Sequence, residues 1–182
     1  MRAAIRLIAE VGPTAFTLRE VARRAGVSHN APYRHFRDKD DLMTAVATEG
    51  YRELTEAMER AARGQNRAID RLKYAGLAYI EFALRRPEHF TVMFDAPLLG
   101  PTHQESNDAA KEAFSMLVGL VRVAQQSSEL ADGDPLEYAY LAWTMVHGVA
   151  KLAITGRLPY RTRPGLLKFA SFVIAQSLPT RH

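Results

Sequence analysis

One stretch of the chain, residues 17–39, constrains the fold more than any other. It reads TLREVARRAGVSHNAPYRHFRDK. Thr17 and Glu20 have the spacing of a capping box, in which a hydroxyl at the helix N-cap is followed three residues later by a carboxylate. Gly26 stands where this helix must end, because glycine tolerates a positive φ. The stretch therefore predicts a short helix, a tight turn from which Val27 packs into the core, and a second helix.

The second predicted helix covers residues 29–36, with Ser28 as its N-cap. It carries an amide, two imidazoles and a guanidinium, and it is too short to be stable by itself. Two helices joined by a tight turn, the second of them polar, form the arrangement with which helix-turn-helix proteins enter the major groove of DNA. A surface helical hairpin with a merely solvated polar face has the same spacing. Spacing by itself therefore leaves both interpretations open.

Residues 4–46 resemble the N-terminal domain of the TetR family of transcriptional regulators. Pro32 is a departure, because many members have an apolar residue with a free N–H there; so early in a helix it removes only about one backbone hydrogen bond. The resemblance implies a three-helix DNA-binding domain. It rests on the ordered signatures Gly-Val-Ser, Tyr-x-His-Phe and Lys-x-x-Leu, and the matching residues are Ala4, Gly12, Phe16, Thr17, Val21, Ala22, Ala25, Gly26, Val27, Ser28, Tyr33, His35, Phe36, Lys39 and Leu42.

On this basis the residues expected to contact DNA fall into two classes. Lys39 lies near a helix N-terminus, whose N–H groups also attract anions. Asparagine suits adenine and arginine suits guanine, because each forms two hydrogen bonds with the base edge. We expect phosphate contacts from Thr17, Ser28, Tyr33, His35 and Lys39. We expect contacts with bases, or with phosphates beside them, from Arg19, His29, Asn30, Ala31 and Arg34.

Composition limits the class of protein. The 182 residues are 47% hydrophobic, enough for a core in one domain or two small ones. The chain has no cysteine, which excludes a disulfide framework and a thiolate metal site and fits a cytoplasmic protein. We find no signal peptide and no apolar run long enough to span a membrane. The net charge of +4 predicts only mild attraction to an anionic partner, so DNA binding would depend on a few placed side chains, in two copies.

Hydrophobic periodicity predicts an all-α protein. Ala4, Ile5, Ile8 and Val11 should form the inner face of the first helix. A long helix starting after an Asp38 cap should join a helix-turn-helix DNA-binding domain, residues 1–48, to a ligand-binding and dimerisation domain, residues 49–182. The last helix is apolar on nearly all sides, so it should be buried in the monomer or against another copy. The predicted helices are 2–11, 18–25, 29–36, 39–62, 66–85, 87–95, 102–128, 135–155 and 164–178.

The C-terminal half resembles the WHG-type regulatory domain of some TetR regulators. A helical domain that binds an inducer needs a mostly apolar cavity with few polar groups. Aromatic and methionine side chains usually form the core, and some of them should line such a cavity. The two motifs are Arg86-Pro87-Glu88-His89-Phe90 with Met93-Phe94, and Trp143-Thr144-Met145-Val146-His147-Gly148 with Leu152. The candidate ligand-binding residues are Tyr79, Phe82, Phe90, Met93, Phe94, Phe114, Trp143 and His147.

His147 has two interpretations. A lone histidine on an apolar stripe is more often a hydrogen-bonded core residue than a ligand contact or a base. Its place in the resemblance, near the pocket and the dimer helices, keeps a role in the effector site or the interface open. The residues alone do not decide between these.

Two functions are compatible with the sequence. The first is a homodimeric repressor that pairs through residues 135–155 and 164–178, binds a palindromic operator in double-stranded DNA and is released by a small apolar or amphipathic effector. The alternative is a helical enzyme or small-molecule carrier without DNA function. The sequence has no phosphate loop, dinucleotide fingerprint or hydrolase signature, and its six histidines are scattered. We therefore predict no catalysis, no cofactor and no metal.

Overall fold

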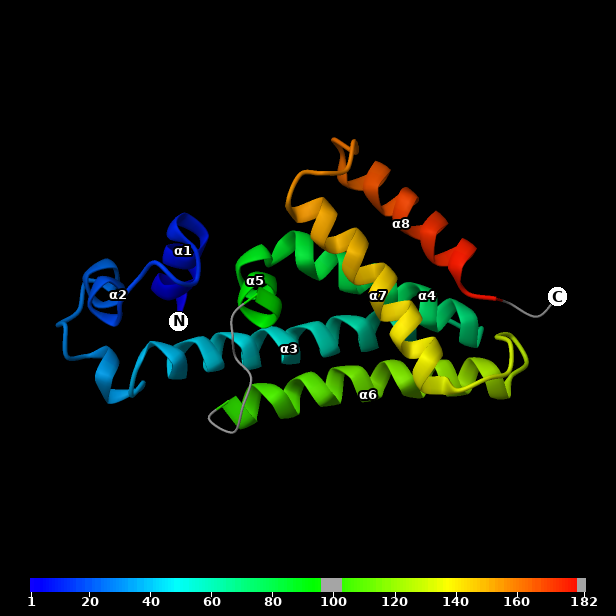
Figure 1. The fold of residues 1–182 in the computed structure, drawn as a ribbon, viewed down its shortest axis with the longest axis horizontal. Coiled ribbons are helices and arrows are strands. Elements are labelled where there is room, and N and C mark those ends of the chain that lie inside the picture. Colours follow the sequence, from blue (N-terminus) through cyan, green and yellow to red (C-terminus); the bar gives the residue numbers. More distant parts are fainter. Residues whose placement is uncertain (96–102, 180–182) are drawn as a thin grey trace. The chain divides into compact units, whose positions relative to one another are not determined.

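The computed structural model describes residues 1–95 and 103–179, which are helical with no strand (Figure 1). The all-α prediction is therefore confirmed for the described chain. Residues 96–102, which include the predicted Thr102 cap, lie outside it. The elements are α1 (Arg2–Val11), α2 (Leu18–Ala25), the 3-10 helix η1 (Pro32–Arg34), α3 (Lys39–Arg63), α4 (Ala68–Arg85), α5 (Pro87–Asp95), α6 (Gln104–Gln126), α7 (Pro135–Ile154) and α8 (Arg163–Ser177).

The chain packs as two compact units. Unit 1 comprises Met1–Arg52 and Arg86–Ala110, and unit 2 comprises Glu53–Arg85 and Lys111–His182. These units are defined by packing, whereas the predicted boundary at Thr48 divides the chain by function, and that boundary stays a prediction. No helix in the described residues has the length and apolar character needed to cross a membrane.

Unit 1 is built around α1, which packs on α2 and α5, while α2 packs on η1. The predicted cap of α2 forms: the Thr17 hydroxyl accepts a hydrogen bond from the Glu20 backbone N–H at 3.2 Å. The helix ends at Gly26, whose φ of 68° confirms the predicted left-handed turn. At the start of α3, the Asp38 carboxylate accepts from the Asp41 N–H at 2.8 Å. The three predicted boundaries therefore follow from local capping chemistry.

The predicted α-helix over residues 29–36 is wrong. Only Pro32–Arg34 is helical, as one 3-10 turn, and its N-cap is Ala31 instead of Ser28. Pro32 has no N–H to donate to the carbonyl of Ser28, so the α-helical hydrogen bond between these residues cannot form. The Ser28 carbonyl instead accepts from the Ala31 N–H at 2.9 Å, three residues on. This short-range pattern produces the tighter 3-10 geometry.

Two valines predicted to be inside are exposed. Val27 is 49% exposed and Val11 is 44% exposed. The buried face of α1 consists of Ala4, Leu7 and Ile8, so the contact ends before Val11 at the last position of the helix. Val27 follows the left-handed Gly26, where the chain turns away from α2, and it remains on the surface.

Gly50 allows α3 and α5 to approach each other closely within unit 1. A Cβ at Gly50 would lie 2.5 Å from Sδ of Met93 and 3.3 Å from Cβ of His89. We expect Gly50→Val to lower the free energy of unfolding by roughly 1–3 kcal/mol, because overpacking forces neighbouring atoms to shift. The control is Gly119→Val in α6, where a Cβ would meet nothing within 4 Å. Urea unfolding measures both variants, and equal losses would contradict this close packing.

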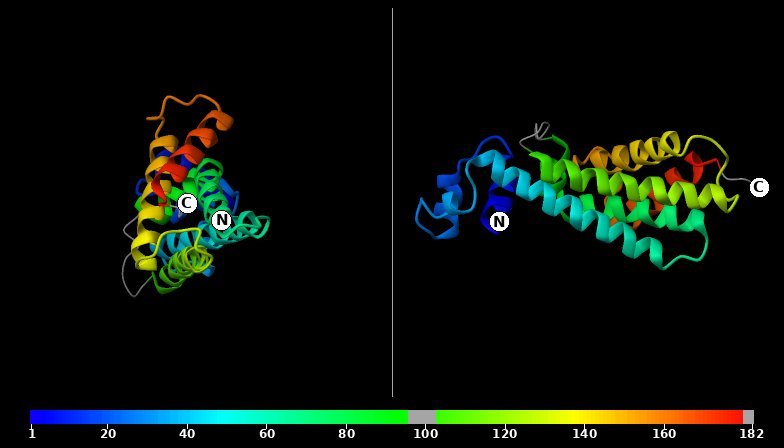
Figure 2. Two further views of the ribbon diagram at one scale, coloured as in Figure 1. Left: turned by 90° about the vertical axis from the view of Figure 1, so that its right-hand side faces the viewer. Right: turned by 90° about the horizontal axis from the view of Figure 1, so that it is seen from below.

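In unit 2, α4, α7 and α8 pack against one another (Figure 2). A Cβ at Gly76 of α4 would lie 3.1 Å from both Ile174 of α8 and Val146 of α7, so the glycine permits the three helices to meet. The predicted cap of α7 forms, with the Asp134 carboxylate accepting from the Leu136 N–H at 2.9 Å. The prediction that α8 is buried holds for one face only, because Phe172 is 60% exposed within the single chain.

The N-terminus of α4 is capped by a residue far away in the sequence. The Glu129 carboxylate accepts from the N–H groups of Ala68 at 3.1 Å and Ile69 at 3.3 Å. Desolvation raises the pKa of this carboxyl, but the two hydrogen bonds and the charge of Arg67 outweigh it and lower the pKa below its ordinary value. Glu129 thus fixes the segment between α6 and α7 to the start of α4.

Candidate nucleic-acid interface and effector site

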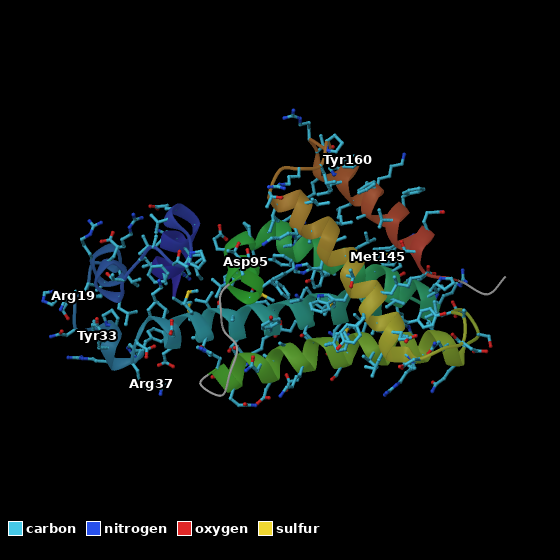
Figure 3. The ribbon with its side chains drawn as sticks, in the orientation of Figure 1. Arg19, Tyr33, Arg37, Asp95, Met145 and Tyr160 are labelled. Carbon is cyan, nitrogen blue, oxygen red and sulfur yellow. The ribbon has the colours of Figure 1, made fainter. Side chains whose placement is uncertain are left out.

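Most of the predicted DNA-contacting residues lie on the exposed surface around α2 and η1. Arg19 and Tyr33 extend outward from the same end of unit 1 as Arg37 (Figure 3). Tyr33 is 50% exposed. The exposed predicted residues are Thr17, Arg19, Ser28, His29, Asn30, Tyr33, Arg34 and His35, while Ala31 and Lys39 are partly exposed.

A surface hollow lies where α2 meets the turn that follows it. Arg19 and Arg23 of α2, together with Val27 and His29, line this hollow. Two guanidinium groups suit phosphates or guanine, and an exposed valine suits an apolar contact such as a thymine methyl group. Arg23 and Val27 were not among the predicted contacts. The signal for Arg23 was available, because it follows Arg19 by one helical turn and shares its face.

The arginines of unit 1 differ in whether a carboxylate already holds them. Arg24 pairs with Glu10 at 2.6 Å, and Arg37 pairs with Asp41 at 3.3 Å. The guanidinium groups of Arg19 and Arg34, by contrast, form no ion pair with any residue that the structure describes. These two cations are therefore available to an external anion without breaking an internal pair.

Glu20 holds the arginines at the end of α2. Its carboxylate lies 2.5 Å from the Arg23 guanidinium and 3.3 Å from that of Arg24. The hydrogen bond from Arg23 lowers the pKa of Glu20 to about 2, with Arg24 assisting and burial opposing. Glu20 is therefore ionised at neutral pH. It orients Arg23 at the hollow while also offsetting part of its charge.

Lys39 has an internal role that the sequence did not predict. Its Nζ donates to the Thr14 carbonyl at 2.6 Å and lies 4.7 Å from the centre of the Phe16 ring. These contacts fix the α1–α2 loop to the first residue of α3. Its phosphate contact stays a prediction, and a loss of DNA binding on mutating Lys39 would also report a loosened unit 1.

The predicted effector-binding residues fall into two groups, one in each unit. In unit 1, the rings of Phe90 and Phe94 lie 4.7 Å apart, and the Tyr51 hydroxyl donates to the Met93 carbonyl at 2.9 Å. Burial raises the pKa of Tyr51 to about 12. Phe90, Met93 and Phe94 therefore form part of a tightly packed region that includes α5. The members of the second group are Tyr79, Phe82, Phe114, Trp143 and His147.

The unit 2 group has a polar centre. The Tyr79 oxygen accepts from Nε1 of Trp143 at 3.2 Å and lies 2.9 Å from Nδ1 of His147. The ring of Phe114 lies 6.0 Å from that of Trp143 and 4.8 Å from that of Tyr140. His147 is thus hydrogen-bonded within the chain, as its structural interpretation predicts. Tyr140, which the sequence did not single out, belongs to the same aromatic cluster.

We expect Tyr79→Phe to lower the free energy of unfolding by about 1–2 kcal/mol. The change deprives Trp143 and His147 of a shared partner, and a lost buried hydrogen bond typically costs this amount. The matched control is Tyr74→Phe on the same helix, where the ring is 42% exposed. Guanidinium unfolding compares the two variants. A Tyr79→Phe protein as stable as the control would show that this polar centre contributes little.

Comparison with known proteins identifies the family. Residues 1–46 match the family described as bacterial regulatory proteins, tetR family, and residues 72–172 match the tetracyclin repressor-like C-terminal domain. The chain belongs to the TetR family. In the residues that the structure describes, this TetR-family protein has no group of three His, Asp or Glu side chains suited to a metal ion.

Individual relatives agree with this assignment. A solved protein of unknown function from Rhodococcus sp. RHA1 is 31% identical, covers 97% of this chain and 94% of its own, and has a TM-score of 0.81. The regulator FadR from Bacillus subtilis, solved with stearoyl-CoA, covers 100% and 97% with a TM-score of 0.83; at 19% identity the likeness shows the fold. An HTH-type transcriptional repressor of Mycobacterium tuberculosis is 38% identical over 73 residues, which is 39% of this chain and 39% of the repressor.

Proposed function

We propose that this TetR-family protein is a ligand-responsive repressor that binds a palindromic operator as a homodimer. The observation that carries the proposal is the surface of α2 and η1, where Arg19 and Arg34 are exposed and make no ion pair with any residue that the structure describes. The mycobacterial relative, a transcriptional repressor by name, matches this chain over 73 residues. Because the operator lies in chromosomal DNA, we propose that the protein acts in the cytoplasm.

We propose that some of these side chains contact bases and others contact phosphates. Arg34 and Asn30, on and before η1, are the proposed base readers, because arginine and asparagine make the specific bidentate pairs with guanine and adenine. Arg19 and Arg23 line the hollow and would hold phosphates or bases beside it. The short η1 exposes these side chains by a tight turn, so readout here depends on loop geometry more than on a long helix.

Dimerisation is proposed through α7 and α8, over residues 135–155 and 164–178. Tyr140 and Phe172 are 53% and 60% exposed, and large exposed side chains that gather into an apolar patch mark protein interaction sites. A dimer would present two copies of the α2–η1 surface, as a palindromic operator requires. In this proposal, residues 1–48 form the DNA-binding domain, and residues 49–182 form the domain that binds the effector and the second copy.

The proposed effector is small and apolar or amphipathic. Aromatic side chains of unit 2 would contact its apolar part, and the Tyr79–His147 pair offers a polar group for a head group. The structure of FadR in complex with stearoyl-CoA supports this proposal, because it has the same fold. The motif around Trp143 and His147 supports the WHG-type assignment of the C-terminal half, which is part of this proposal.

A competition gel shift tests the function. The purified protein is mixed with labelled DNA from upstream of its own coding sequence, and unlabelled specific or scrambled duplex is added. A repressor is expected to form a discrete complex that the scrambled duplex removes only at much higher concentration. Equal competition by both duplexes would contradict operator binding and favour a carrier function for the helical bundle.

A further inference from the structure

The carboxylate of Glu20, in the first turn of α2, is the centre of a small network of charges. Both of its oxygens accept from Arg23: Oε2 from Nε at 3.0 Å, and Oε1 from Nη2 at 2.5 Å. Oε1 also accepts from Nε of Arg24 at 3.3 Å, and Arg24 donates from Nη1 to Glu10 of α1 at 2.6 Å. Two carboxylates therefore hold two guanidinium groups where α1 packs on α2.

Helix capping does not explain this network. In a complete capping box, the carboxylate would accept from the backbone N–H of the N-cap residue, Thr17. The Thr17 hydroxyl does accept from the Glu20 N–H at 3.2 Å. Within the described residues, however, the hydrogen bonds that reach the Glu20 carboxylate come only from Arg23 and Arg24. Half of the predicted box forms, and the arginines occupy the other half.

Folding stability is a weak reason for the pair between Glu20 and Arg23. The two side chains are 32% and 71% exposed, and ion pairs this exposed contribute little to stability because water screens them. The pair does fix the direction of Arg23, because two parallel N–H···O bonds to one carboxylate define the plane of the guanidinium. Glu20 therefore acts mainly on where Arg23 presents its remaining N–H groups.

The arginine held in this way lines the surface hollow between α2 and the turn that follows it. Arg19, Val27 and His29 line the same hollow. Arg19 has no carboxylate partner in the part of the chain that the structure describes. The two guanidinium groups of the hollow thus differ, since Arg23 is oriented and partly neutralised and Arg19 is neither. The Nη1 edge of Arg23, which Glu20 does not hold, remains for an external acceptor.

We propose that Glu20 is a specificity-determining residue that orients Arg23 for the operator and weakens the attraction of this surface to DNA of any other sequence. The inference rests on the proposed operator binding and adds a residue that itself contacts no DNA. Binding without sequence preference comes from cations that neutralise phosphates, and a carboxylate among those cations opposes it. Specificity is a difference between two affinities, so a repulsive group can increase it.

The two effects of Glu20 differ between the operator and other DNA. Repulsion weakens binding to both, because both carry the same phosphates. Orientation of Arg23 strengthens binding only where an acceptor lies in the correct place, because the side chain has then lost its conformational freedom before binding. The hydrogen bond from Arg23, assisted by Arg24 and opposed by burial, lowers the pKa of Glu20 to about 2. Both effects are therefore fully present at neutral pH.

Glu20→Gln tests the proposal, because glutamine keeps the size and helix propensity of the side chain and removes its charge. Affinity for a scrambled duplex is expected to rise about threefold to tenfold near 0.1 M salt, since each chain loses one repelling charge. Affinity for the operator should rise less or fall, because Arg23 loses its orientation. The ratio of operator to scrambled affinity should therefore fall about threefold or more. A ratio equal to that of the wild type would overturn the proposal.

Glu10→Gln is the matched control. It removes the same charge from unit 1 and breaks the 2.6 Å pair with Arg24, while the pair between Glu20 and Arg23 stays intact. The ratio of operator to scrambled affinity is expected to stay within about twofold of wild type. Circular dichroism should show both variants folded. An equal fall in both variants would assign the effect to net charge or to a loosened contact between α1 and α2, and would overturn the role of Arg23.

A double-mutant cycle shows whether Glu20 acts through Arg23. In an Arg23→Ala protein, Glu20→Gln is expected to leave the affinity ratio within about twofold, because the side chain that Glu20 orients is absent. The salt dependence provides a second measurement. Glu20→Gln alone should steepen the slope of log affinity against log salt on scrambled DNA by about 1 per chain, since the released Arg23 then neutralises a phosphate. A full loss of specificity without Arg23 would contradict the mechanism.

Failure of this inference is distinguishable from failure of the proposed function. A wild-type protein that binds operator and scrambled duplexes equally refutes operator recognition before any variant is compared. A wild-type protein that discriminates between the duplexes, together with a Glu20→Gln variant that discriminates equally well, refutes the role of Glu20 and leaves the repressor function intact.

Discussion

Replacing Arg34 with alanine is expected to weaken operator binding by about 5- to 150-fold for each half-site. Arg34 is exposed at the end of η1 and makes no ion pair within the described chain, so its guanidinium is available to a base edge. A bidentate arginine–guanine contact contributes about 1–3 kcal/mol of discrimination. Two half-sites in one dimer double this loss of free energy, giving a reduction of roughly thirtyfold or more in affinity. Fluorescence anisotropy with operator and scrambled duplexes measures the effect.

Arg37→Ala is the matched control for this change. Arg37 is three residues away on the same surface, but its guanidinium already pairs with Asp41 at 3.3 Å. We expect the control to bind the operator within a few-fold of wild type. Arg34→Ala should lose affinity for the operator while keeping most of its affinity for scrambled DNA. An equal loss on both duplexes would show that Arg34 contacts only phosphates.

An apolar or amphipathic compound that binds unit 2 is expected to lower operator affinity by about 5–150-fold. The physical route is α3, a continuous helix whose first part lies in unit 1 and whose last part lies in unit 2. A ligand that displaces α3 would alter the separation of the two DNA-reading surfaces, which must match the groove spacing together. Compounds that raise the melting temperature of the free protein are tested for release of labelled operator.

Linkage provides the decisive control for this switch. If the compound weakens operator binding by a given factor, the operator must weaken compound binding by the same factor. Trp143→Phe, which removes the indole donor to Tyr79, should bind the compound less tightly, whereas Tyr74→Phe at an exposed position should not. If every tight-binding compound left operator affinity unchanged at saturation, this switching mechanism would be wrong.

Helix boundaries could be predicted from the sequence because they are set by local chemistry. The caps at Thr17, Asp38 and Asp134 each bond a backbone N–H two or three residues away. The left-handed turn at Gly26 likewise needs no information beyond its neighbours. Capping residues and glycines therefore indicate the ends of α2, α3 and α7 without any information on tertiary contacts.

The segment of residues 29–36 was predicted less well than the helix boundaries, although Pro32, which explains the difference, is visible in the sequence. The Ser28 cap and the polar series favour a full helix over residues 29–36, and the family resemblance suggests that Pro32 is a tolerated departure. In a segment this short, one missing N–H removes a large share of the hydrogen bonds available to it. A single 3-10 turn replaces the helix. The missing N–H of Pro32 therefore had more effect on this segment than the Ser28 cap.

Long-range contacts could not be predicted from one sequence. The Glu129 cap on α4 and the Lys39 bond to Thr14 join residues 61 and 25 positions apart. The periodicity of apolar residues indicates which face of a helix is covered, but not which element covers it. The candidate effector residues accordingly looked like one set, although α5 packs in unit 1 and Tyr79 in unit 2.

Hydroxyl-radical footprinting on the upstream DNA tests operator recognition by a dimer most directly. We expect two protected half-sites related by a palindrome, with centres about 34–36 Å apart or a multiple of this distance, as two copies of one reading surface require. Protection should disappear in Arg34→Ala and persist in Arg37→Ala. Protection that is uniform along the duplex, or confined to one unpaired site at saturating protein, would contradict it.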